Sequence, residues 1–145
     1  MTRPRYAMLM AALGAALSGC GEKAAMPADL FPPTVNGVWN RTGLRDLPVN
    51  DSPDPVPRNA VERIRTASYK GPGELEARVY LLDSAEVGAT LGTRWRPSAD
   101  TVFFNHGPYF VVIKWQSPDR KALQEFVAEL QKKLGASGPT QAKPR

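Results

Sequence analysis

The residues best able to do chemistry in this chain are a single cysteine and a single histidine. Cys20 carries the only thiol and His106 the only imidazole among the 145 residues. A zinc site draws three or four ligands, mainly from these two residue types, so we expect no dedicated zinc site. One cysteine also excludes an intramolecular disulfide. What remains for Cys20 is chemistry at its own sulfur, because a thiolate is a good nucleophile.

The segment that leads to Cys20 has three parts. Residues 1–5 carry two arginines and no acid, Tyr6–Leu17 is an unbroken apolar run, and Ser18 and Gly19 follow. A basic start, a short apolar stretch and small residues at its end are the parts of a secretory signal peptide. Twelve apolar residues span only about 18 Å as a helix, against about 30 Å for the hydrocarbon core. We therefore expect no permanent transmembrane anchor.

The end of this segment resembles a bacterial lipobox, in which an aliphatic residue and two small residues precede an obligatory cysteine. The matching residues are Leu17-Ser18-Gly19-Cys20. The resemblance implies that signal peptidase II cuts between Gly19 and Cys20 after diacylglycerol is attached to the sulfur, and that the new amino group is then acylated, for instance with palmitate. Two or three acyl chains hold a small domain on a bilayer. The alternative is a cysteine that packs as a small apolar side chain.

The same resemblance gives an expected location. Residues 1–19 are the signal peptide, and the mature protein is an envelope lipoprotein that faces the periplasm. Gly21 stands where an aspartate would favour retention in the inner membrane, so the outer membrane is favoured. The mature chain keeps seventeen basic and fourteen acidic residues, a net charge of +3. Nucleic acid is not expected as a partner, because the chain has no run of basic residues.

Neither His106 nor the aspartates form a recognisable catalytic or metal-binding pattern. A general base needs a nucleophile within hydrogen-bond reach, and the sequence contains neither G-x-S-x-G nor H-E-x-x-H. We interpret His106 as a residue of the loop Asn105–Pro108. Asp51, Asp54 and Asp100 lack the spacing of a calcium-binding loop. We therefore expect no catalytic residue, cofactor or metal, and an enzyme such as a small hydrolase is the least favoured class.

Two groups of larger side chains leave alternatives open. The aromatic residues could line a ligand pocket, although in a domain of this size they more often form the core; they are Trp39, Trp95, Trp115, Tyr80 and Phe104. A set of arginines could face anionic lipid headgroups or form an ordinary solvated surface; it comprises Arg63, Arg65, Arg78, Arg94 and Arg96. Lys70-Gly71-Pro72-Gly73 is interpreted as a hairpin turn rather than a phosphate loop, because proline lacks an N–H.

The first part of the mature chain is rich in proline. Seven of the fourteen prolines lie in residues 21–57. Proline fixes φ and removes a backbone donor, which disfavours a long helix or a central strand. We therefore interpret residues 20–57 as a tether that begins with the lipidated cysteine, in which Leu30–Trp39 lies against the domain. Residues 136–145 are small and polar and form a tail that is expected to be disordered.

Residues 58–135 show the periodicities of one folded domain. Period-two alternation predicts a hairpin of residues 66–70 and 75–81, and aromatic and β-branched runs predict a second one of residues 101–104 and 109–115. Residues 58–65 could be helix or strand.

Two helices complete the predicted domain. Asp83-Ser84 supplies the N-cap of a helix that ends before Pro97, and Ser117 and Pro118 begin a second helix that ends at Gly135. The apolar face of the second helix is one stripe, formed by Leu123, Phe126, Val127, Leu130 and Leu134. The order strand-strand-helix-strand-strand-helix predicts an α+β fold with an antiparallel sheet of about four strands.

The domain also resembles a group of uncharacterised exported bacterial lipoprotein domains. The matching features are Tyr69-Lys70-Gly71, the strand end Val79–Ser84 and the amphipathic segment 120–134. The resemblance implies one exported domain, and it brings no established activity with it. We therefore expect a lipid-anchored, non-enzymatic module that binds an envelope protein or another ligand. The alternative is a structural or assembly subunit of an envelope complex.

Overall fold

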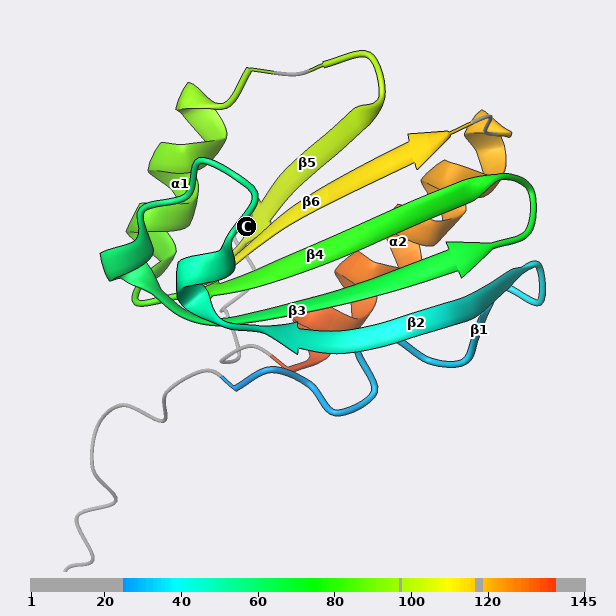
Figure 1. Ribbon diagram of the computed structural model, residues 1–145, viewed down its shortest axis with the longest axis horizontal. Helices are drawn as coiled ribbons and strands as arrows, with labels where there is room; N and C mark the ends of the chain where they lie inside the picture. Colours follow the sequence, from blue (N-terminus) through cyan, green and yellow to red (C-terminus); the bar gives the residue numbers. More distant parts are fainter. Residues whose placement is uncertain (1–24, 97, 117–118, 138–145) are drawn as a thin grey trace, which may run out of the picture.

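A computed structural model describes residues 25–96, 98–116 and 119–137, which form one antiparallel sheet and two α-helices (Figure 1). The sheet has six described strands in the order β1-β2-β3-β4-β6-β5. They are β1 (Thr34–Val35), β2 (Trp39–Leu47), β3 (Val61–Lys70), β4 (Glu74–Leu82), β5 (Thr101–His106) and β6 (Tyr109–Gln116). The helices are α1 (Ala85–Arg94) and α2 (Arg120–Ser137), and two short 3₁₀ turns are η1 (Val49–Asp51) and η2 (Arg58–Ala60). The α+β class and the antiparallel sheet are as predicted.

The prediction of about four strands was wrong, because β1 and β2 lie in the stretch that was interpreted as a tether. β2 pairs with β3 from Asn40 to Leu47, with a bulge after Arg41. Most of β2 is exposed, and Trp39 is its only buried residue. An edge strand of this kind lacks the alternation of apolar residues that marks a strand in the sequence. The expectation that Leu30–Trp39 lies against the domain is confirmed, since both residues are buried.

The hairpin of β3 and β4 is longer than predicted. After η2, the chain enters β3 at Val61, so the ambiguous residues 58–65 contain a short turn and then a strand. Gly71 begins the turn between β3 and β4, where a Cβ would lie 2.0 Å from the carbonyl oxygen of Val38. Only glycine allows the β3–β4 turn to approach the β1–β2 turn this closely.

α1 crosses from β4 to the edge strand β5 and packs directly on the sheet. The Ser84 side chain accepts a hydrogen bond from the Val87 N–H, as the predicted cap requires. A Cβ at Gly92 would lie 2.9 Å from Asn105 Oδ1, so this glycine permits close packing of α1 on β5. β5 and β6 meet in a turn at Gly107 and Pro108, which is tighter than the predicted four-residue loop.

The two faces of the sheet have separate hydrophobic cores. On one face, α2 and the segment around Leu30 cover residues such as Trp39, Tyr69 and Phe126. On the other face, α1 and the segment of η1 cover Ile64, Tyr80 and Phe110. Every buried residue of both cores lies between Met26 and Leu134, so a chain that begins at Gly21 contains the whole of both cores. Such a chain therefore retains what the domain needs to fold.

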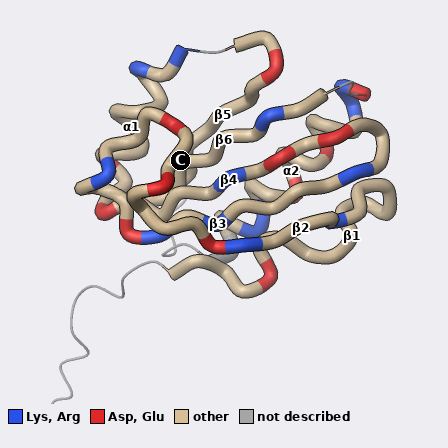
Figure 2. The backbone as a smooth tube through the Cα atoms, viewed as in Figure 1, with Lys and Arg blue, Asp and Glu red and all other residues tan. Residues whose placement is uncertain are grey.

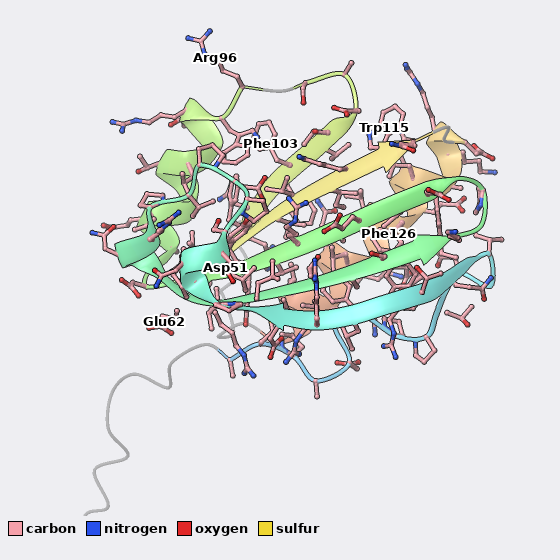
Figure 3. All side chains as sticks on the ribbon, in the orientation of Figure 1. Asp51, Glu62, Arg96, Phe103, Trp115 and Phe126 are labelled. Carbon is pink, nitrogen blue, oxygen red and sulfur yellow. The ribbon has the colours of Figure 1, made fainter. Side chains whose placement is uncertain are left out.

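α2 runs diagonally behind the strands (Figure 1), and Phe126 points from it toward the sheet (Figure 3). The predicted stripe is confirmed for Leu123, Phe126, Leu130 and Leu134, which are buried, whereas Val127 is partly buried. The helix continues to Ser137 rather than ending at Gly135, and the predicted cap at residues 117–118 lies outside the described residues. Asp119 Oδ1 instead accepts hydrogen bonds from the backbone N–H groups of Lys121 and Ala122. Neither described helix combines the length and the apolarity of a membrane-spanning helix.

Candidate functional site

The face of the sheet that carries α1 is covered over only part of its length. β2, β3, β4 and β6 continue beyond the second core, and their side chains on this face then become polar. They surround a shallow depression of about 420 Å³ near the β3–β4 turn. Its lining comprises Thr42, Ser68, Tyr69, Lys70, Glu74, Leu75, Glu76, Asp100, Lys114, Trp115 and Gln116. A smaller hollow of about 130 Å³ adjoins it and shares Ser68 and Glu76. We call the two together the polar depression.

The strand register explains why these residues gather. Lys70 lies opposite Glu74, Ser68 opposite Glu76, and Glu76 opposite Lys114. Residues directly opposite each other on antiparallel strands project from the same face. The alternation along β4 therefore places Glu74, Glu76 and Arg78 on the face with the depression, while Leu75 and Ala77 enter the core under α2.

A buried ion pair closes one end of the polar depression. Arg78 Nη1 lies 2.9 Å from Asp54 Oδ2, and the two side chains are only 8% and 5% exposed. Burial alone lowers the pKa of the Arg78 guanidinium, but the hydrogen bond and the charge of Asp54 outweigh it and raise that pKa. Arg78 is therefore a fixed cation under the segment that follows η1.

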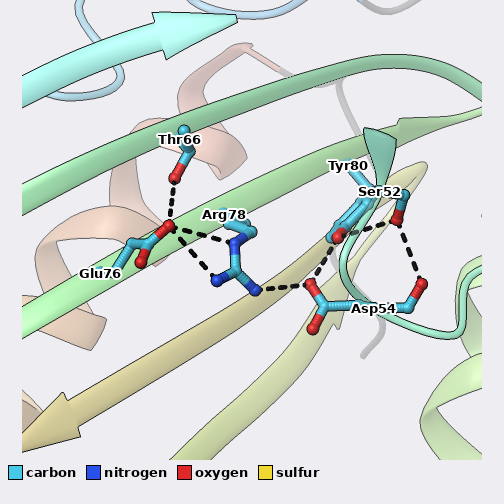
Figure 4. Close-up of polar contacts among 6 residues, drawn as sticks. All are labelled: Ser52, Asp54, Thr66, Glu76, Arg78 and Tyr80. Atoms are coloured by element: carbon cyan, nitrogen blue, oxygen red, sulfur yellow. Dashed lines mark hydrogen bonds and ion pairs between the residues drawn. The ribbon is translucent and has the colours of Figure 1, made fainter. Parts of the chain in front are cut away.

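The same guanidinium holds Glu76 in place. Glu76 Oε1 lies 3.3 Å from both Arg78 Nε and Arg78 Nη2, and it accepts a hydrogen bond from Thr66 Oγ1 at 3.2 Å (Figure 4). The Glu76 side chain is 37% exposed, so its carboxylate meets both the buried pair and the solvent. The Arg78 guanidinium and the Thr66 hydroxyl thus hold this carboxylate at the wall of the depression.

Tyr80 completes the network on the buried side. Its hydroxyl donates to Asp54 Oδ2, and Ser52 Oγ lies 3.2 Å from the Tyr80 oxygen (Figure 4). Burial raises the pKa of the Tyr80 phenol, and the hydrogen bond to Asp54 adds to this rise. Tyr80 therefore stays a neutral donor to Asp54 throughout the physiological range.

Charges of both signs are interspersed around the depression. Lys70 Nζ lies 3.4 Å from Glu74 Oε1, with Lys114 on the adjacent strand β6 and Asp100 in the turn before β5. The same mixture of signs extends over the rest of the view in Figure 2, where neither sign forms a large field. The arrangement suits a partner that itself carries both positive and negative groups.

The structure separates the other candidate residues named from the sequence. Cys20 lies outside the described residues. His106 ends β5 on the face of α2, with its ring close to Gly135, and it makes no hydrogen bond or ion pair with any described residue. Asp54 pairs with Arg78, whereas Asp51 is exposed and Asp100 accepts hydrogen bonds from Ser98 and Thr101. Within the described ranges, no three His, Cys, Asp or Glu side chains are placed to share a metal ion.

The tryptophans do not line a common pocket. Trp39 is buried under α2 and donates from Nε1 to the carbonyl of Ala122 at 3.2 Å. Trp95 lies on the other face, with its ring centre 5.0 Å from that of Phe110. Phe104 packs against the core under α2, on the face opposite Tyr80. Only Trp115 lines the polar depression.

The arginines considered as a lipid-facing patch lie in different surroundings. Arg63 and Arg65 both bind Asp46, at 3.1 and 2.8 Å, and Arg65 holds the pKa of that carboxyl below its usual range. Arg78 is buried, and Arg96 points outward beyond the end of α1 (Figure 3). The five arginines considered from the sequence therefore do not form one patch for anionic headgroups.

The sequence did not predict the interactions that organise the polar depression. Asp54 lies in a proline-rich segment 24 residues before Arg78, and nothing local links the two. The only signal was a charged pair, Glu76 and Arg78, on the polar side of a strand. Such residues usually face water, and here the segment that follows η1 covers Arg78.

Comparisons with protein-family models, with curated proteins and with solved structures give no match for this chain.

Proposed function

We propose that the protein is a lipid-anchored, non-enzymatic binding module of the bacterial cell envelope, and that the polar depression is its binding surface. The observation that supports this proposal best is the uncovered end of the sheet, where a preoriented carboxylate and four other charged side chains face solvent together. Preoriented groups reduce the ordering cost of binding. The partner is a polypeptide segment of another envelope protein with charges of both signs.

Anchoring rests on Cys20, and the described residues support the geometry that it needs. The Ala25 carbonyl accepts a hydrogen bond from the Tyr109 hydroxyl at 2.7 Å, and Asp29 Oδ2 lies 3.1 Å from Lys133 Nζ. The segment that follows the anchor is thus held to the start of β6 and to α2. Cys20 precedes Ala25 by five residues, a reach of at most about 18 Å.

This attachment point favours presentation of the polar depression away from the bilayer. Tyr109 and Gln116 stand at opposite ends of β6, seven residues apart, which is about 24 Å along a strand. The lipid-proximal end is the β5–β6 turn with the end of α2, and the depression lies at the other end. A partner in the periplasm can therefore reach it while the lipids remain inserted.

Site-directed photo-crosslinking in intact cells tests this function. A photoreactive side chain at Ser68, inside the polar depression, should give one discrete protein adduct. The same probe at Thr90, on the exposed side of α1, is the matched control and should give none. Glu74→Lys in the Ser68 probe chain should reduce the adduct by about tenfold, the equivalent of one lost charge-assisted contact. No adduct at Ser68, or equal adducts from both positions, contradicts the proposal.

One observation favours the alternative of a structural subunit. β2 has no described strand on its outer side from Thr42 to Leu47, and Leu44 there is 47% exposed. An open edge with an exposed apolar residue can accept a strand from another protein. A probe at Asp46, which lies on this edge outside both hollows, would assign the interaction to the edge if it gave the adduct and Ser68 did not.

A further inference from the structure

An apolar groove lies on the opposite face from the polar depression, between α2 and the edge formed by β5 and β6. Its volume is about 370 Å³, within the usual range for small-ligand sites. Most of the lining surface is apolar and comes from residues such as Val102, Trp115, Leu123 and Val127, while the exposed side chains of Gln124 and Gln131 also border the groove. The groove follows α2 from Arg120 to Gln131, eleven residues or about 16 Å along the helix. This length suits the chain of a medium-length acyl group.

Two hydrogen-bond donors at one end of this groove have no partner among the described residues. Trp115 Nε1 is buried, and no group accepts its proton. Buried donors of this kind are rare in folded proteins, because leaving one unpaired is costly. Arg120 is exposed at the first turn of α2, lines the same groove and forms no ion pair with a described residue. Both donors stand at the junction of β6 and α2, where Trp115 is labelled in Figure 3.

We propose that this groove binds a free fatty acid, with its carboxylate at Arg120 and Trp115 and its hydrocarbon tail between α2 and β5. One cation and one indole N–H at the end of an apolar channel match one carboxylate on one apolar tail. A polypeptide would bring backbone amides along the whole groove. Gln124 and Gln131 could bond a few of them from the α2 side, but Val102, Leu123 and Val127 offer the others no hydrogen bonds. This site lies apart from the polar depression and does not require lipid on Cys20.

Isothermal titration calorimetry with dodecanoate tests the site, using the chain that begins at Gly21 and so lacks the lipidated cysteine. We expect saturable binding of one dodecanoate per chain. Dodecanol, which has the same tail without the charge, should bind about tenfold more weakly. Arg120→Gln should weaken the binding of dodecanoate by a similar factor. Trp115→Phe, which keeps an aromatic ring but removes the N–H, should weaken it several-fold.

Two further variants keep the test decisive. Ala128 is exposed and lines the groove, so Ala128→Trp should fill it and abolish binding while circular dichroism shows an intact fold. Arg94→Gln, a charge change at the end of α1, should leave the affinity unchanged. The proposal is overturned if dodecanoate does not bind saturably, or if Ala128→Trp binds as tightly as the original chain. Equal affinities for dodecanoate and dodecanol would overturn the assigned carboxylate contact.

Discussion

Arg78 and Asp54 form a buried ion pair between a central strand and a proline-rich segment, with 2.9 Å between Nη1 and Oδ2. Tyr80 donates to the same carboxylate, and Glu76 accepts from the other side of the guanidinium. The pair therefore joins the segment after η1 to the sheet and, through Glu76, fixes the wall of the polar depression. Stability and the proposed binding surface are therefore linked, because one arginine supports both.

Loss of Asp54 should destabilise the domain strongly. Asp54→Ala leaves the Arg78 guanidinium buried without its counter-charge, and breaking a buried pair in this way costs about 3–5 kcal/mol. The measurement is the free energy of unfolding by urea at neutral pH. Asp51→Ala, three residues earlier and exposed, should cost less than about 0.5 kcal/mol.

A double variant distinguishes the energy of the ion pair from the energy of side-chain packing. Arg78→Met removes the orphaned charge, so Asp54→Ala with Arg78→Met should be less destabilised than the sum of the two single changes. Additive effects would show that the two side chains are not energetically coupled.

The packing of α2 predicts a large difference between its two faces. Phe126→Ala and Leu130→Ala remove side chains that are 2% and 3% exposed, and each should cost about 2–5 kcal/mol. Phe126 also has ring contacts with Trp39 and Tyr69, at 6.0 and 5.0 Å between centres. Glu125→Ala, on the exposed side, should cost less than about 0.5 kcal/mol. Similar melting temperatures for all three variants would show that the face of α2 assigned to the core is not the buried one.

The buried tyrosines predict loss of stability at alkaline pH. Burial raises the pKa of Tyr69 to about 12, and it also raises the pKa values of Tyr80 and Tyr109. When the folded-state pKa is raised, the contribution of the tyrosine to stability is fully present below the unfolded-state pKa of about 10. This contribution falls as the pH rises toward the folded-state pKa. Each tyrosine lowers the free energy of unfolding by up to about 1.4 kcal/mol per pH unit in this window.

Phenolate absorbance provides the measurement. The chain from Gly21 has only these three tyrosines, so the folded protein should show clearly less phenolate at about pH 10.5 than the unfolded chain, which is mostly ionised there. As much phenolate as in the unfolded chain at that pH, with circular dichroism still native, would refute the assigned burial.

His106 is expected to carry no catalysis. It lies beside Gly135 with no hydrogen bond or ion pair to a described residue, and a general base needs a nucleophile within reach. His106→Ala should therefore leave the fold, the Ser68 adduct and every tested hydrolytic rate unchanged. Turnover by the original protein that His106→Ala abolished, with the fold intact, would require an enzymatic function instead.

The elements with strong periodicity were predictable from the sequence, and the edge of the sheet was not. Alternation in β4 and the stripe of α2 reflect burial against a core on one side, which leaves a regular apolar pattern. Trp39 is the only buried residue of β2, and Leu47 packs partly buried against the second core; the residues between them are held mainly by backbone hydrogen bonds to β3. Backbone pairing leaves almost no trace in side-chain type, and seven prolines in residues 21–57 pointed away from a strand.

The candidate site was predictable only at the level of its residue types. The mixture of Lys70, Glu74 and Glu76 around a turn was visible, but the burial of Arg78 depends on Asp54, which is distant in the sequence. Trp115 was considered as part of an aromatic pocket, yet its place beside the apolar groove follows from the packing of α2 against β5. Tertiary contacts, rather than local spacing, determine both surfaces.

Lipid attachment at Cys20 is the central claim, since the location, the orientation and the class of partner all depend on it. Cells that express the full chain, with either Cys20 or Cys20→Ala, can be grown with an alkynyl analogue of palmitate, and the protein can then be isolated and tested for the label. We expect strong labelling of the Cys20 chain in the membrane fraction and none of the Cys20→Ala chain. Equal labelling of both chains, or labelling of neither, would contradict the account.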